Sequence, residues 1–143
     1  MSETLIVGVD GSETALRAAR RAAEIAVKLD AELVVVTAHA SDNTEVVSIG
    51  SDTWILDDAE QARKLAQRVA NDVAAAVDGV KISATAAHGK PGEVLIAEAD
   101  ERKASLLVVG NVGMKGLGRV LGSVASSVAH SAPCDVLVVK TDK

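Results

Sequence analysis

The sequence predicts a three-layer α/β domain built around a parallel sheet. Short apolar runs, of which residues 5–10 are the first, are rich in β-branched residues, as expected for strands buried on both faces. Segments with apolar residues at helical spacing alternate with these runs. This alternation favours parallel strands joined by right-handed helical crossovers. At 143 residues, the chain is expected to form one domain, residues 1–143.

The first strand–helix–strand unit is expected within residues 5–38. After the strand at 5–10, Ser12 is a suitable N-cap for a helix that continues to about residue 29. Small residues occupy one face of this helix, and charged residues lie off that face. A second strand is expected at 33–38. The small residues are Ala15, Ala19, Ala22, Ala23 and Ala26.

The remaining elements continue the alternation after one irregular segment. Residues 41–56 are polar and mixed in composition, and we expect a mobile connection there. The later expected elements are a helix at 57–77, a strand at 81–87 with the alternation of an edge strand, a turn at 89–92, a helix at 93–102, a strand at 106–109, a helix at 120–131 and a strand at 136–139.

The composition disfavours nucleic acid as a partner. The chain has one Trp and neither Tyr nor Phe, so its core must be aliphatic and it lacks the aromatic platforms on which single-stranded bases stack. The net charge of −5 provides no basic field that would attract a polyanion. We therefore expect no nucleic-acid binding.

The chain is also expected to be cytoplasmic and to bind no membrane. Cys134 is its one cysteine, which allows no internal disulfide and suits a reducing compartment. The first residues lack the basic start and the apolar stretch of a secretion signal. No apolar segment reaches the roughly 18 residues that a membrane-spanning helix needs.

The most specific motif is a glycine-rich loop between the strand at 106–109 and the helix that follows. A strand, a glycine loop and a helix in this order can hold a phosphate with backbone N–H groups and the positive end of the helix dipole. A Walker A loop is excluded, because no window supplies Gly-Lys-Ser/Thr in register. The dinucleotide fingerprint is excluded too, because the third glycine comes one residue late, at Gly122, and after the wrong strand.

The spacing that remains is Gly110-x2-Gly113, a gap, and then Gly122-Ser123. This pattern resembles that of the ATP-binding members of the universal stress protein family, G-x2-G-x9-G-(S/T). Here eight residues, not nine, separate Gly113 from Gly122. The resemblance covers nearly the whole chain; it extends to residues 7–12, 89–91, 107–110, 132–134 and 136–139.

The resemblance implies a doubly wound sheet of order 3-2-1-4-5 with a ligand crevice where the strand order reverses. Asp10 would lie near the ribose and base, Ala38 and His39 would border the adenine, and the glycine loop would bind the phosphates, with charge assistance from Lys115 or Arg119. The implied nucleotide-binding residues are Gly8, Val9, Asp10, Ala38, His39, Gly110, Asn111, Gly113, Met114, Arg119, Gly122, Ser123 and Val124.

By the same resemblance, the chain is expected to be a stress-response regulator or sensor that binds an adenine nucleotide. ATP is favoured, with Mg²⁺ as a companion. Cyclic AMP is a rival, because residues 111–113 are similar to those of small actinobacterial members that bind it. A homodimer paired through the apolar strand at 136–139 is expected. The alternatives are a nucleotide-free dimeric interaction module and a slow ATP-hydrolysing enzyme.

Simpler interpretations stand beside these assignments. Asp10 and Ser123 could each be no more than helix caps, the glycines could only form a turn, and Lys115 and Arg119 could be solvated loop charges. The three histidines lack metal-ligand spacing. Ser126, Ser127 and His130 lack a nucleophile elbow, and we interpret them as exposed helix residues. Cys134 is expected to pack beside the last strand, and the role of Trp54 is left open.

Overall fold

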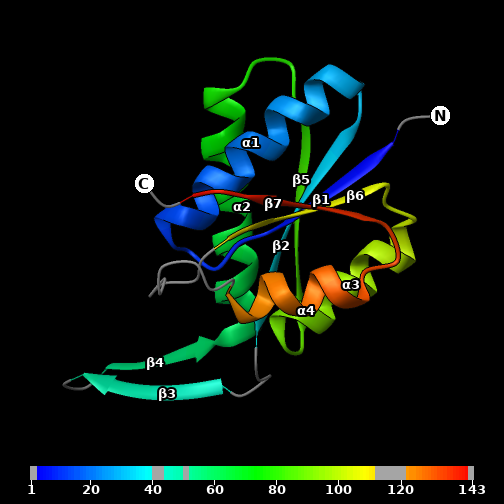
Figure 1. The fold of residues 1–143 in the computed structure, drawn as a ribbon. Helices are drawn as coiled ribbons and strands as arrows, with labels where there is room; N and C mark the ends of the chain where they lie inside the picture. Colours follow the sequence, from blue (N-terminus) through cyan, green and yellow to red (C-terminus); the bar gives the residue numbers. More distant parts are fainter. Residues whose placement is uncertain (1–2, 40–43, 50–51, 112–121, 142–143) are drawn as a thin grey trace.

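A five-stranded parallel sheet forms the centre of the molecule (Figure 1). The computed structural model describes residues 3–39, 44–49, 52–111 and 122–141. The sheet strands are β1 (Thr4–Gly8), β2 (Glu32–His39), β5 (Lys81–His88), β6 (Leu106–Gly110) and β7 (Asp135–Val139). Their order is β5-β2-β1-β6-β7 and every pairing is parallel. Counted along the chain within this sheet, the order is 3-2-1-4-5, which confirms the prediction.

Helices cover both faces of the sheet and complete the three layers. The helices α1 (Glu13–Leu29) and α2 (Asp58–Ala76) pack on one face, while α3 (Pro91–Arg102) and α4 (Ser123–Ser131) pack on the other (Figure 1). Neighbouring strand residues point to opposite faces. In β1, for example, Leu5 and Val7 join the core beneath α1 and α2, whereas Ile6 joins the core beneath α3 and α4.

Alanine lets α1 approach the sheet closely. The Ser12 side chain accepts a hydrogen bond from the backbone N–H of Ala15 at 3.1 Å, so Ser12 is the N-cap as predicted. The helix ends at Asp30, which adopts the left-handed conformation with φ of 54°. The fully buried alanines of α1 are Ala18, Ala19, Ala22, Ala23 and Ala26. These small side chains complement the aliphatic strand residues in a core without aromatic side chains among the described residues.

The connection predicted at 41–56 is largely a β-hairpin, so that prediction is wrong. β3 (Thr44–Ile49) and β4 (Asp52–Asp57) pair antiparallel, with Val47 opposite Trp54, and lie apart from the five-stranded sheet (Figure 1). Two apolar, β-branched runs on either side of Gly50-Ser51 are themselves a hairpin signal. The polar composition between residues 41 and 56 outweighed that signal in the sequence interpretation.

Several predicted element boundaries shift by a few residues. β1 ends at Gly8 and not at residue 10, although the Val9 N–H still donates to the Val36 carbonyl oxygen at 3.0 Å. α4 begins at Ser123, with Gly122 as its N-cap, whereas the prediction began at residue 120. Residues 120 and 121 lie outside the described part of the chain. β5 lies at one edge of the sheet, as its alternation predicted.

Candidate functional site

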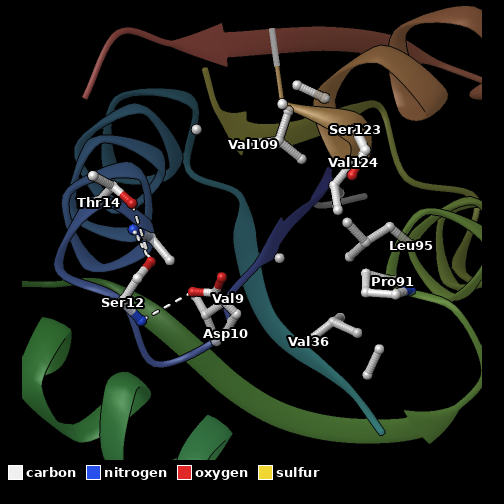
Figure 2. Close-up of a pocket in the computed structure, with 16 residues that line it drawn as sticks. Val9, Asp10, Ser12, Thr14, Val36, Pro91, Leu95, Val109, Ser123 and Val124 are labelled. Carbon is white, nitrogen blue, oxygen red and sulfur yellow. Dashed lines mark hydrogen bonds between the residues drawn. The ribbon is translucent and has the colours of Figure 1, made fainter. Parts of the chain in front are cut away.

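A crevice lies at the carboxyl ends of β1 and β6, where the strand order reverses (Figure 2). β1 continues into α1 on one face of the sheet, and α4 covers the other face, so the chain diverges at this point. The crevice has a volume of about 160 Å³. Its lining residues are Gly8, Val9, Asp10, Ser12, Thr14, Ala15, Val36, Ala38, Pro91, Leu95, Val109, Gly110, Gly122, Ser123, Val124 and Ala125.

Asp10 occupies the turn between β1 and α1 at one side of the crevice. Its Oδ1 accepts a hydrogen bond from the Ser12 N–H at 2.9 Å, and the Ser12 hydroxyl lies 3.0 Å from the Thr14 hydroxyl (Figure 2). The cap of α1 is Ser12, so Asp10 holds the turn that leads into the helix and does not itself cap it. The turn keeps an acidic group at the crevice.

The N-terminus of α4 forms the opposite side. Gly122 is the N-cap and supplies no side-chain cap, so no side chain satisfies the first N–H groups of the helix. Ser123 is the first helical residue, is exposed and lines the crevice, which means that the interpretation of Ser123 as the helix cap is wrong. Free N–H groups and the positive end of the helix dipole make this position suitable for an anion.

Asn111 fixes the base of the glycine loop. Its backbone carbonyl oxygen accepts a hydrogen bond from the Gly122 N–H at 3.0 Å, which joins the two ends of the loop. Its side-chain Oδ1 accepts hydrogen bonds from the backbone N–H of Thr141 at 2.8 Å and from the Thr141 hydroxyl at 3.1 Å. Arg17 donates to the carbonyl oxygen of Thr141 at 2.8 Å, and Thr141 is only 2% exposed. These contacts place Asn111 in a structural clamp, defined here as Arg17, Asn111 and Thr141.

The structure brings most of the predicted residues together. Those that line the crevice are Gly8, Val9, Asp10, Ala38, Gly110, Gly122, Ser123 and Val124. Two do not: Asn111 belongs to the clamp, and His39 lines a separate hollow beside α2. Gly113, Met114, Lys115 and Arg119 lie outside the described residues. Their assignments, like the binding roles of all the others, stay predictions.

The sequence interpretation missed the contribution of α3. Pro91 and Leu95 line the crevice opposite the β1 turn, as Figure 2 shows. The turn before α3 follows the third strand of the parallel sheet, and the carboxyl ends of parallel strands meet at one edge. The Gly89-Lys-Pro91 segment was therefore a usable signal for this side of the crevice.

Other reactive side chains show no catalytic arrangement in the part of the chain that the structure describes. His39 and His88 lie at the ends of neighbouring strands, with ring centroids 5.6 Å apart, but no three metal-ligating residues cluster among the described residues. Cys134 is half-buried next to β7. Burial, and then the negative charge of Asp135, raise the pKa of its thiol, which keeps Cys134 protonated and poorly reactive at neutral pH.

Comparisons with known proteins agree over nearly the whole chain. Residues 1–140 match the model of the universal stress protein family. Universal stress protein Rv1636 of Mycobacterium tuberculosis is 37% identical over 153 aligned residues, which cover 97% of each chain. A universal stress protein solved by crystallography in complex with cAMP is 36% identical, with 98% of each chain covered and a TM-score of 0.75.

The fold also matches a more distant structure, that of the universal stress protein UspA from Lactobacillus plantarum. It has a TM-score of 0.75 at 23% identity and covers 96% of this chain and 97% of its own. Among the described residues, no helix is both long and apolar enough to cross a membrane. The family match, the close relatives and the shared fold lead to one conclusion: the chain belongs to the universal stress protein family.

Proposed function

We propose that this protein binds an adenine nucleotide in the crevice and acts in the cytoplasm as a regulator or sensor of the stress response. One observation carries the proposal: the crevice joins the β1 turn to the uncapped N-terminus of α4 at the reversal point of the sheet. The relative solved with cAMP, at 36% identity over 98% of the chain, supports an adenine nucleotide as the ligand.

The residues of the crevice suit the parts of such a ligand. Val9, Val36 and Val109 provide an apolar surface for a base. The Asp10 carboxylate can accept a hydrogen bond from a ribose hydroxyl. The N–H groups of the first turn of α4 and the hydroxyl of Ser123 can donate to a phosphate. These are binding functions, and the proposed role is ligand-dependent regulation and not turnover.

Among adenine nucleotides, we infer a preference for cyclic AMP over ATP. The relative with cAMP supports this preference, as does the glycine loop, which is one residue shorter than the ATP-binding pattern. The described crevice, at about 160 Å³, is also smaller than the roughly 300–1,000 Å³ of most small-molecule sites. ATP with Mg²⁺ is the competing ligand in the test below.

Calorimetric titration with cAMP and with ATP tests the proposal on Ser123→Ala. The substitution removes a hydroxyl at the crevice that caps no helix, so we expect unchanged stability and about tenfold weaker cAMP binding, the usual loss for a hydrogen bond to a charged group. Ser126→Ala is the matched control, because Ser126 is exposed on the same helix but does not line the crevice. If wild-type protein binds neither nucleotide at millimolar concentration, the nucleotide-free interaction module is the better description.

We also propose that the protein forms a homodimer through β7. Within the described residues, β7 pairs with β6 alone, and its residues Val136 to Val139 are half-buried in the single chain. An apolar edge strand with one free side promotes pairing between chains. Sedimentation equilibrium at low micromolar concentration is expected to give the mass of a dimer; a monomer at that concentration would contradict the proposal.

A further inference from the structure

A second hollow lies between the carboxyl end of β2 and the first half of α2. Its lining residues are Asp10, Thr37, Ala38, His39, Gln61, Ala62, Lys64, Leu65 and Arg68, and we call it the α2 hollow. Its volume of about 490 Å³ lies within the range of small-molecule sites. Asp10 and Ala38 line both the α2 hollow and the nucleotide crevice, so the two spaces adjoin. Only the α2 hollow includes Thr37 and the residues of α2.

Thr37 brings an unused hydroxyl to this hollow. The residue is 4% exposed, and its Oγ1 has no hydrogen-bond partner in the described part of the chain. A buried hydroxyl without a partner costs free energy, and valine would fill the same volume without that cost. Thr37 lies two residues after Val35, which packs beneath α1 and α2, so its side chain faces the same layer. The unsatisfied hydroxyl therefore points to a polar group that binds there.

The side chains from α2 specify the charge of that group. Lys64 and Arg68 are four residues apart, so they lie on one face of the helix, where two like charges destabilise it unless an anion lies between them. Lys64 forms an exposed ion pair with Glu60 at 3.5 Å. Arg68 forms no ion pair with any described residue.

The one acidic residue of the α2 hollow is partly neutralised. The Asp10 carboxylate accepts the hydrogen bond of the Ser12 N–H at 2.9 Å, and it lies on the wall shared with the crevice. Lys64 and Arg68 come from the opposite wall, formed by α2. The α2 side of the hollow thus carries two positive charges and, with Gln61 and Thr37, further hydrogen-bond donors.

We propose that the α2 hollow is a second ligand site, which binds the phosphoryl group of a small phosphorylated molecule. Arg68 and Lys64 hold the phosphoryl oxygens, and the Thr37 hydroxyl donates to one of them. The hollow is larger than one phosphate, which leaves room for the molecule that carries it. This site is distinct from the nucleotide crevice and does not depend on nucleotide binding there.

Inorganic phosphate is the probe for this site. The full-length protein is titrated by calorimetry at constant ionic strength, and the methyl resonance of Thr37 is followed by NMR to locate the bound ion. We expect saturable binding with a shift of that methyl resonance. Arg68→Gln and Thr37→Val should each weaken binding about tenfold, because each removes a hydrogen bond to a charged group. Thr37→Val should fold at least as well as wild type, since it removes an unsatisfied buried hydroxyl.

Arg63→Gln is the matched control, because it removes the same charge from an exposed position of α2 outside the hollow. It should leave phosphate affinity within about twofold of wild type, as expected for a screened surface charge. Equal losses in Arg63→Gln and Arg68→Gln, no saturable binding, or an unmoved Thr37 resonance would each overturn the proposal. Titration of Arg68→Gln with cAMP reports the crevice separately: its affinity should equal that of wild type, and failure there concerns the proposed nucleotide function alone.

Discussion

Leu107→Ala is expected to lower the free energy of unfolding by about 2–5 kcal/mol, the range measured for buried leucines. Leu107 lies in the middle of β6, is 0% exposed, and belongs to the core between the sheet and the helices α3 and α4. The large cost is expected because truncation removes buried apolar surface and leaves a cavity that rigid strands on both sides cannot fill. Urea denaturation followed by far-UV circular dichroism measures the change.

Leu29→Ala is the matched control for this experiment. Leu29 is the last residue of α1 and is 49% exposed, so the same truncation should change the free energy of unfolding by less than about 0.5 kcal/mol. Similar effects of the two substitutions would contradict the assignment of Leu107 to the core.

Gly8→Ala is expected to lower the free energy of unfolding by about 1–3 kcal/mol, the usual cost of overpacking a buried site. A Cβ atom at Gly8 would lie 2.6 Å from Cδ1 and 3.0 Å from Cδ2 of the buried Leu95, so α3 or its leucine must move. Both residues line the crevice, and the displaced leucine should also weaken cAMP binding. Urea denaturation and calorimetry measure the two effects.

Gly110→Ala provides the comparison at the end of the neighbouring strand. A Cβ atom there would meet Thr141 at 3.5 Å, which is an ordinary contact, so Gly110→Ala should be tolerated much better than Gly8→Ala. Leu95→Val removes both Cδ atoms and should recover about 1 kcal/mol of the Gly8→Ala loss in a double-mutant cycle. Strict additivity of the two substitutions would show that contact with Leu95 is not the cause.

The fold could be predicted from the sequence because its main signals are local. The β-branched run at residues 5–10 and the alanine face of α1 each report burial through the period of the pattern, and their alternation gives a parallel sheet. The hairpin of β3 and β4 was missed because the segment as a whole is polar, although each of its strands carries apolar residues.

The candidate site could be predicted only in part, because some of its residues act through contacts distant in sequence. The glycines and Asp10 follow strand ends, and sequence order alone brings them to one edge of the sheet. Asn111 looked like a ligand residue, but its side chain holds Thr141, thirty positions away along the chain. No pattern around Asn111 encodes that partner. The unsatisfied Thr37 hydroxyl is likewise invisible until β2 and α2 are placed together.

The hairpin of β3 and β4 has a practical consequence for spectroscopy. Trp54 lies in β4, and the chain has no other tryptophan and no tyrosine, so all of its ordinary intrinsic fluorescence originates in the hairpin. Emission spectra therefore report on this appendage, while the parallel sheet and its aliphatic core are spectroscopically silent. An emission change on adding a ligand would indicate that the hairpin responds, and an unchanged spectrum would say nothing about the crevice.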